Sequence, residues 1–342
     1  MDFSIEQTND YREVIRLYKI VYPEKRTYKF DWLYTTKPAG RAEIFLARDN
    51  DSGKVIGSYV IMPMRIWFFD RIIIAGQAID GMVHPEFRRA RIFNTMQERL
   101  HDRLRQKYEF LIGFPNVLAL HPLLKAGARE FGPLATYSFP LTSQFLAKRP
   151  AQGNVFHTIL SFLLKPAIAF YRYLHLGKVG TGGYRLEAVP DNEIHTGFSF
   201  ETIRKVHPVM TVRDVDFIRW RFFHAPTTKY IFLQFYRETD ALGYISIRFE
   251  HKAVAIVDFC IDGPIEEQLS ALRLLIDYCY QRQAKSIHFQ LSEACYCTAA
   301  LSRAGFIRRK GIYSIILMPY SEESQRLQFA DFFLTFADTD WL

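Results

Sequence analysis

The stretch Gly76-Gln77-Ala78-Ile79-Asp80-Gly81-Met82-Val83-His84-Pro85-Glu86-Phe87-Arg88-Arg89-Ala90-Arg91-Ile92-Phe93-Asn94 contains the change of pattern that decides the fold. A β-rich run over 72–83 ends just before Pro85, and three arginines follow. Apolar residues then recur three to four positions apart, which predicts a helix over 92–107 with one buried face. A helix start offers unpaired backbone N–H groups and a positive dipole end, to which nearby arginines add charge. The stretch predicts strand, basic turn and helix around a phosphate or pyrophosphate; the alternative is a solvated turn on a basic protein.

The composition indicates a well-packed protein with an anionic partner. At 342 residues, two domains of middling size are expected. Hydrophobic residues make up 49% of the chain and aromatic residues 15%, so a large core can form. The formal net charge of +8 favours an anionic partner, and CoA, nucleotide sugars, tRNA and acidic lipid all fit that charge.

The cysteines and the N-terminus bear on cellular location. The cysteines are confined to the second half and lack Cys-x-x-Cys spacing, so we predict reduced core thiols and no metal site. They are Cys260, Cys279, Cys295 and Cys297. Residues 1–6 lack the pattern of a signal peptide, and no apolar run reaches the roughly 20 residues that span a bilayer. A soluble or peripheral protein of the cytoplasm is expected.

The first half of the chain predicts helices followed by a strand meander. Apolar spacing and turn residues predict short helices over 11–22 and 30–34, and a third that ends at Gly127. The strands are expected over 44–48, 55–62, 65–69, 72–83 and 110–113.

This order and the opening stretch resemble the GNAT N-acetyltransferase superfamily. In that family a strand ending in Val-x-Pro-x-x-Arg/Gln-x-x-Gly-x-Gly/Ala leads into a helix whose first amides hold the CoA pyrophosphate. Arg88 matches the leading Arg/Gln, whereas Arg91 and Phe93 stand at the two glycine positions. The resemblance implies acetyl-CoA or another acyl-CoA as co-substrate. The implied contacts are Met82, Val83, Arg88, Arg89, Ala90, Arg91, Ile92, Phe93 and Asn116.

The resemblance also implies how acyl transfer would proceed. In GNAT-type transfer an amine attacks the thioester directly, and Asp80 stands close to where many members carry a catalytic carboxylate. The alternative is that Asp80 and Gly81 only mark a bulge. The amides of Met82 and Val83 would hold the thioester carbonyl. His84 would shuttle a proton or, alternatively, cap the strand.

A second motif of the family covers the segment after the predicted strand 110–113. Asn116, Ala119 and Gly127 match the spacing Asn-x-x-Ala-x-x-x-Tyr-x-x-x-Gly-Phe, but Leu123 takes the place of the tyrosine that protonates the leaving thiolate. Tyr137 is a weak substitute for that acid.

Past residue 184 the chain repeats its first half. Trp220-Arg221-Phe222 mirrors Trp32-Leu33-Tyr34 at an offset of 188, and Asp258 follows Asp80 at an offset of 178. We therefore predict a mixed α/β fold of two tandem GNAT-like domains, each a mostly antiparallel sheet flanked by helices. The expected boundaries are 1–147 for the acyl-CoA domain, 148–184 for a helical connector and Gly-rich loop, 185–320 for the second domain and 321–342 for a tail.

The second copy differs where the cofactor would sit. After Asp258 it has no arginine and carries three acids, which repel a pyrophosphate. It resembles the C-terminal halves of FemAB-like and double-GNAT proteins, and we expect it not to bind CoA. The tail Ala337-Asp338-Thr339-Asp340-Trp341 resembles the ending of relatives from polysaccharide gene clusters.

Three classes of function remain open. The first is an acyl-CoA-dependent N-acyltransferase for a small-molecule amine such as an amino sugar or polysaccharide precursor. The second is a FemAB-like transferase that uses charged tRNA, which would need a basic stripe across both domains. The third is an inactive GNAT scaffold that binds a ligand or partner. No DNA partner and no particular oligomer is predicted; the basic, apolar segment 155–176 predicts packing between domains or, alternatively, peripheral membrane contact.

Overall fold

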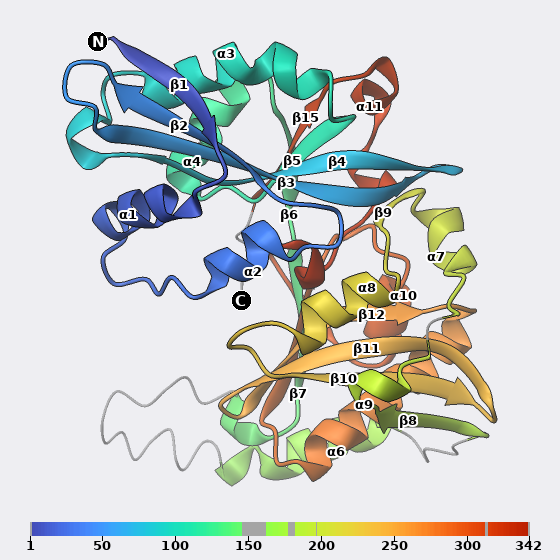
Figure 1. The fold of residues 1–342 in the computed structure, drawn as a ribbon. Coiled ribbons are helices and arrows are strands. Elements are labelled where there is room, and N and C mark those ends of the chain that lie inside the picture. Colours follow the sequence, from blue (N-terminus) through green and yellow to red (C-terminus); the bar gives the residue numbers. More distant parts are fainter. Residues whose placement is uncertain (1, 146–161, 177–181, 196, 312–313, 341–342) are drawn as a thin grey trace.

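The computed structural model describes residues 2–145, 162–176, 182–195, 197–311 and 314–340. Within these residues the chain forms two mixed sheets, one above the other in Figure 1, with helices on their faces. The predicted fold class, mixed α/β with two sheets flanked by helices, is confirmed.

The first sheet has the order β1-β2-β3-β4-β5-β15-β6, and β9 joins it beside β3. Antiparallel pairing holds all of this path except β4 with β5, which run parallel. The strands are β1 Phe3–Thr8, β2 Glu43–Asp49, β3 Val55–Phe68, β4 Arg71–Val83, β5 Phe110–Gly113, β6 Arg129–Pro133, β15 Ser314–Pro319, β9 Val209–Thr211 and its partner β16 Phe332–Phe333.

Alternating side chains place helices on both faces of the first sheet. In β2, Ile44 and Leu46 share a buried cluster with α1 (Tyr11–Val21) and α2 (Lys29–Thr35). Phe45 and Ala47 share another with α3 (Ile92–Arg105) and α4 (Val117–Lys125). Because side chains of a strand point alternately to opposite faces, strands covered on both sides read as continuous apolar runs.

One predicted division of the first sheet is wrong. The predicted strands 55–62 and 65–69 are a single strand, β3, which continues through Pro63. The pairing of β3 with β2 ends at Ile61, so Pro63 lies beyond that partner. A missing N–H therefore removes no ladder bond on that side of the strand.

The second sheet has the order β14-β7-β13-β12-β11-β10-β8. Its strands are β7 Ala135–Pro140, β8 Tyr184–Ala188, β10 Tyr230–Arg237, β11 Asp240–Glu250, β12 Ala253–Ile261, β13 Ser286–Leu291 and β14 Ile307–Arg309. The helices α6 Lys165–Leu176, α7 Glu201–Val206, α8 Val215–Ile218, α9 Ile265–Gln281, α10 Thr298–Arg303 and α11 Glu322–Arg326 complete the described part of this half.

The two halves exchange strands. Strand β7, from the end of the predicted first domain, pairs with β13 and β14 in the second sheet. Strand β15, from the end of the predicted second domain, lies between β5 and β6 in the first sheet. Each sheet is thus completed by the other half of the chain, which ties the halves together.

The repeat predicted from sequence also meets in space. Trp32 and Trp220 stack at 4.5 Å between ring centroids, with their planes 14° apart. Each indole donates to the other's backbone: Trp32 Nε1 to the Trp220 carbonyl at 3.0 Å, and Trp220 Nε1 to the Trp32 carbonyl at 3.4 Å. These reciprocal contacts satisfy two buried donors and place Trp32 against Trp220, the two residues that the predicted repeat pairs.

Candidate active site at the split between two strands

The candidate site lies where β4 and β5 diverge. These parallel strands pair only from Gly76 to Ala78 with Leu111 to Gly113. Beyond that point a cavity of about 390 Å³ opens between them. Its lining is Tyr18, Tyr22, Lys25, Lys29, Tyr59, Ala78, Ile79, Asp80, Gly81, Met82, Phe93, Gly113, Phe114, Pro115, Asn116, Ala119, Leu123 and Asp340. The predicted site residues Asp80, Met82, Phe93 and Asn116 are therefore brought together.

A β-bulge shapes one wall of the cavity. The register between β3 and β4 shifts between Ser58 and Val60, and Asp80 takes a φ of 44° at this place. Gly81 leaves room for the ring of Phe93, since an added Cβ would lie 2.6 Å from the Phe93 Cε2 atom. The bulge predicted as the alternative at Asp80 is present, and Asp80 also lines the cavity.

The backbone of β4 offers one amide to the cavity side. The His84 amide donates to the Ile56 carbonyl at 2.8 Å, so the backbone amides of His84 and Met82 point toward β3. Because successive residues of a strand face alternate neighbours, the amide of Val83 points to the edge that β5 has left. Of the two predicted donors, Val83 has the suitable direction and Met82 contributes its side chain to the lining.

Asp80 is the best-placed carboxylate for proton transfer. Its Oδ2 accepts a hydrogen bond of 2.7 Å from the Tyr34 hydroxyl, and its carbonyl accepts one of 2.8 Å from Ser58 Oγ. Burial raises the pKa of Asp80 above its ordinary value, against the opposing charge of Lys29. A carboxylate with a raised pKa is a stronger base, which suits it to accept a proton from an ammonium.

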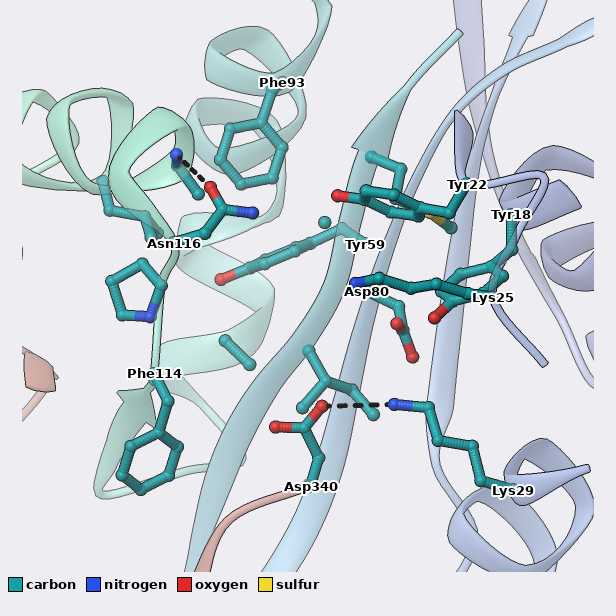
Figure 2. A pocket seen from close by; sticks show the side chains of 18 residues that line it. Tyr18, Tyr22, Lys25, Lys29, Tyr59, Asp80, Phe93, Phe114, Asn116 and Asp340 are labelled. Carbon is teal, nitrogen blue, oxygen red and sulfur yellow. Dashed lines mark hydrogen bonds and ion pairs between the residues drawn. The ribbon is translucent and has the colours of Figure 1, made fainter. Parts of the chain in front are cut away.

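The C-terminal tail contributes the second carboxylate of the cavity. Asp340 Oδ2 lies 3.5 Å from Lys29 Nζ. Figure 2 shows Lys25 and Lys29 extending toward Asp80 and Asp340 from the same side. Burial lowers the pKa of Lys29, but Asp80 and Asp340 outweigh that effect and raise the pKa above its ordinary value. The cavity thus holds two ammonium groups and two carboxylates in close array.

The basic turn lies just outside this lining. Arg88, Arg89 and Arg91 are exposed between the short 3-10 helix Pro85–Phe87 and α3, and Ala90 closes the turn by donating to the Phe87 carbonyl at 3.1 Å. Arg91 has φ 55° and ψ 18°, the left-handed conformation. Glycine adopts this conformation most readily, so the backbone at Arg91 has the conformation that favours glycine.

The first residues of α3 divide between the core and the cavity. Arg91 is the N-cap of α3 and makes no side-chain cap bond. Ile92 is buried in the core of the first sheet, while Phe93 lines the cavity and meets the Tyr59 ring edge-on at 5.6 Å. The uncapped start of this 14-residue helix directly follows the three arginines in the chain, and the Arg91 guanidinium lies 3.6 Å from the Glu98 carboxylate on the same helix.

The remaining predicted residues have mixed outcomes. Asn116 lines the cavity, and its Oδ1 caps α4 by accepting from the amides of Leu118 and Ala119, each at 3.0 Å. Tyr137 lies in β7 of the second sheet beside Phe289 and Arg308, so it does not line the cavity. His84 is buried, and its Nδ1 accepts from the Glu86 amide at 3.4 Å, so it caps the 3-10 helix Pro85–Phe87, whereas the predicted alternative had it cap the strand.

The corresponding place in the second sheet is filled. Strands β12 and β13 pair only from Ala253 to Ile256 with Ser286 to Phe289, and Asp258 follows the last pair as Asp80 follows Ala78. Arg213 is fully buried against Asp258 and Asp338, each at 2.8 Å. Burial opposes the charge of Arg213, but the two carboxylates hold its pKa well above the usual value.

Tyr296 and the tail close the rest of this second split. The Ile261 amide donates to the Tyr296 hydroxyl at 3.1 Å, and Thr335 Oγ1 donates to Asp258 at 2.8 Å. Ile261 follows Val83 at the same offset of 178, and the Ile261 amide is hydrogen-bonded to the Tyr296 hydroxyl in the second half. Side chains thus occupy the part of the second split that corresponds to the cavity of the first.

Sequence reasoning missed several cavity residues. Tyr18, Tyr22, Lys25 and Lys29 come from α1, from α2 and from the segment between them, and Tyr59 comes from β3. Their only signal was an unusual density of tyrosine and lysine over 18–29. Asp340 had a signal in the tail motif, but only the fold shows that the tail reaches the cavity.

The described residues contain neither a cluster of metal ligands nor a membrane-spanning helix. In those residues no group of three or more His, Cys, Asp or Glu side chains is placed to hold a metal ion. Among the described helices, none has the length and apolar character to cross a membrane.

Comparison with known proteins agrees with the architecture of the first half. Residues 5–121 match the family model for the acetyltransferase (GNAT) domain. None of the curated proteins matches the sequence.

Solved structures share the fold over nearly the whole chain. A conserved protein from Enterococcus faecalis V583, described as a probable N-acyltransferase, aligns with a TM-score of 0.63 and 11% identity over 95% of this chain and 74% of that one. A GCN5-related N-acetyltransferase from Anabaena variabilis aligns with a TM-score of 0.61 and 12% identity over 93% of this chain and 73% of that one. Saccharomyces cerevisiae N-myristoyltransferase with bound myristoyl-CoA aligns with a TM-score of 0.55 and 11% identity over 92% of this chain and 82% of that one. At these identities the likeness shows a shared fold alone.

Proposed function

We propose that this protein is an acyl-CoA-dependent N-acyltransferase that moves an acyl group, in the first instance acetyl, to a primary amine. The observation that carries the proposal is the open split between β4 and β5, which exposes Asp80 and the edge of β4 beside a basic helix start. The GNAT domain match over residues 5–121 supports the same chemistry.

The residues present fit an acyl-CoA. The exposed arginines Arg88, Arg89 and Arg91 and the uncapped start of α3 suit a pyrophosphate, and the left-handed backbone at Arg91 gives the turn the shape of the family motif. The outward amide of Val83 suits a carbonyl of the pantetheine arm or thioester. The acyl-CoA supplies the activated thioester, and no metal is needed for this chemistry.

Two side chains have the chemistry for proton transfer. Asp80, with its raised pKa, would accept the proton of the attacking ammonium. Tyr59 lines the cavity, and burial raises its pKa to about 12, so it is protonated at neutral pH and would donate to the leaving thiolate. Tyr59 thereby replaces Tyr137, which lies in the other sheet, and supplies the hydroxyl that Leu123 lacks.

The acceptor we propose is a small polar amine, such as an amino sugar or polysaccharide precursor. Asp340 and Asp80 provide two carboxylates for its ammonium, and Tyr18 and Tyr22 provide aromatic surface beside them. Lys25 and Lys29 would bind hydroxyl or acidic groups elsewhere on the same molecule. The proposed tandem arrangement, in which the second domain binds no CoA, is supported by the Trp32–Trp220 contacts and by the filled second split.

An inactive scaffold is the second candidate, because the tyrosine of the family motif is replaced by the buried Leu123 in the cavity wall. Arg91 supports the scaffold hypothesis less than the sequence alone suggested, since its backbone already has the left-handed conformation that glycine favours.

Calorimetric titration with acetyl-CoA tests the donor site. Arg88→Ala should weaken binding by about 10-fold to 100-fold, the loss expected for one hydrogen bond to a charged group. Arg105→Ala is the matched control, because Arg105 is an exposed arginine near the far end of the same helix. Release of CoA on adding a panel of primary amines, glucosamine among them, then separates enzyme from scaffold. Absence of binding by the wild type would overturn the proposal.

A further inference from the structure

A second cavity lies on the side of the first sheet that α3 and α4 cover; we call it the α3–α4 cavity. It has a volume of about 260 Å³. Since about 10–15 Å³ is enough to admit one water molecule, this cavity has room for a chain of several atoms. Its lining includes Tyr59, Gln97, Leu104, Ala126, Met318 and Tyr320.

The α3–α4 cavity continues the cavity at the split between β4 and β5. Tyr59 lines both cavities. On α3, Phe93 lines the first and Gln97, four residues further along, lines the second. Leu123 on α4 and Ala126 at the end of that helix are divided in the same way. Residues three or four apart lie about one helical turn, 5.4 Å, from each other on the same face. The second cavity therefore begins one turn beyond the first, past the Tyr59 ring.

Gln97 brings an unpaired amide to the α3–α4 cavity. The residue is only 6% exposed, and none of the described residues provides a hydrogen-bond partner for its Oε1 or its Nε2. Burial raises the pKa of Tyr59 to about 12 and the Gln97 amide opposes that rise, so the two side chains lie close together. Because buried side-chain amides almost always have partners, an open one on a cavity wall is suited to bind a polar group of a ligand.

The rest of the lining indicates the chemistry of that ligand. Leu104 and Met318 are buried and apolar. Burial raises the pKa of Tyr320, so its hydroxyl stays protonated at neutral pH. Glu98 and Asp102 are exposed, and they would repel a carboxylate that entered beside them. A neutral chain with a hydroxyl fits this lining, because a hydroxyl can both donate to an amide oxygen and accept from an amide nitrogen.

We propose that the α3–α4 cavity binds the acyl chain of the donor, and that this chain is longer than acetyl and carries a hydroxyl that bonds to Gln97. The inference rests on the proposed function, in which Tyr59 donates a proton to the leaving thiolate. A proton donor to that sulfur must lie beside it, and the acyl carbon is one bond away from the sulfur. The acceptor is a poorer occupant, because its proposed contacts Tyr18 and Lys29 come from α1 and α2 on the opposite face of the sheet.

Calorimetric titration with three donors tests this proposal without reference to catalysis: acetyl-CoA, butyryl-CoA and 3-hydroxybutyryl-CoA. The wild type should bind 3-hydroxybutyryl-CoA about tenfold more tightly than acetyl-CoA, the gain expected for one hydrogen bond in a closed site. Gln97→Leu should reduce the affinity for 3-hydroxybutyryl-CoA to that for butyryl-CoA and leave acetyl-CoA binding within about twofold.

Two further variants separate the cavity from the fold. Ala126→Leu adds atoms to the cavity wall and should weaken both four-carbon donors by about tenfold, with acetyl-CoA unaffected. Gln106→Leu is the matched control, because Gln106 is exposed at the end of the same helix, and it should bind all three donors as the wild type does. Thermal unfolding of each variant checks that the fold is retained.

The outcomes distinguish this inference from the proposed function. Wild-type protein that binds acetyl-CoA as tightly as 3-hydroxybutyryl-CoA overturns the acyl-chain cavity and leaves the acyltransferase standing. A Gln97→Leu variant that weakens all three donors equally overturns it too, since Gln97 would then act on the site as a whole. Absence of binding by every acyl-CoA overturns both.

Discussion

The two halves of the chain build the same split between parallel strands and use it differently. In the first half, β4 and β5 part after Ala78 and leave a cavity of about 390 Å³ with Asp80 in its wall. In the second half, β12 and β13 part after Ile256, and Arg213 enters the space and binds Asp258. The same strand geometry therefore yields a candidate site in one case and a buried ion cluster in the other.

The tail connects these two outcomes. Thr335 and Asp338 close the second split, and Asp340, two residues further along, lines the first. Because the tail is held by a buried cluster in one sheet, it can present a carboxylate at a fixed place in the other. The filled split thus serves the open one by positioning part of its wall.

The largest expected effect is on stability, at the filled split. Arg213→Met leaves Asp258 and Asp338 buried without their cation, and it should lower the free energy of unfolding by about 3–5 kcal/mol in urea titration. Arg65→Met, which breaks a partly exposed pair with Asp214, is the control and should cost at most about 1 kcal/mol. Equal losses of unfolding free energy for both variants would contradict the view that buried Arg213 stabilises the filled split.

The next expected effect is on catalysis, at the open split. Asp80→Asn should lower kcat by about 10²-fold to 10⁴-fold, the range for loss of a general base, while acetyl-CoA affinity stays within about twofold. Since burial raises the pKa of Asp80, the acid limb of kcat/KM, where protonation inactivates the base, should lie above the ordinary carboxyl range and be lost in the variant.

The corresponding change in the second half should have the reverse outcome. Asp258→Asn removes one partner of Arg213 and should destabilise the fold, with any remaining native protein keeping its affinity for acetyl-CoA. An Asp80→Asn variant that unfolds more readily than Asp258→Asn would break the comparison.

A smaller effect is expected at Tyr296. Tyr296→Phe leaves the Ile261 amide without its hydroxyl partner and should cost about 1–3 kcal/mol of stability, measured by thermal unfolding. Tyr28→Phe is the control, because Tyr28 has 44% of its surface exposed. No difference between the two variants would mean that closure of the second split does not depend on this hydroxyl.

The smallest effect is expected at Arg91. Replacing it by glycine removes the strain of a left-handed arginine, about 1–2 kcal/mol, and adds the unfolded-state entropy of glycine, about 0.5–1 kcal/mol. The net result should be a gain of up to about 1.5 kcal/mol in stability. Arg89→Gly, at a position without positive φ, should instead lose stability. The reverse ranking in calorimetry would exclude strain at Arg91.

Local patterns predicted the elements of the first half well. The helix α3 and the strands β2, β4 and β5 follow from short-range apolar spacing, and the bulge at Asp80 follows from an Asp-Gly pair. The merged strand β3 was missed because Pro63 reads locally as a break, and only its place beyond the edge of β2 makes it acceptable.

The site was predicted on one side only. The motif around Arg88 gave the wall formed by β4 and α3, whereas Lys29 and Tyr59 carry no motif and reach the cavity through the packing of α2 and β3. Tyr137 was proposed from its distance along the chain, and the strand exchange carried it into the other sheet.

The sequence by itself determined the strand, basic turn and helix of the first half, the residue matches at offsets of 178 and 188, and the lack of arginine just after Asp258. These features depend on neighbouring residues and on composition, which a chain displays before it folds. Only the tertiary structure decided that β7 pairs in the second sheet and β15 in the first. It also decided that Arg213 fills the second split and that Asp340 reaches the cavity of the first split. Such contacts join residues more than forty positions apart, and their energies depend on burial and geometry that no local pattern encodes.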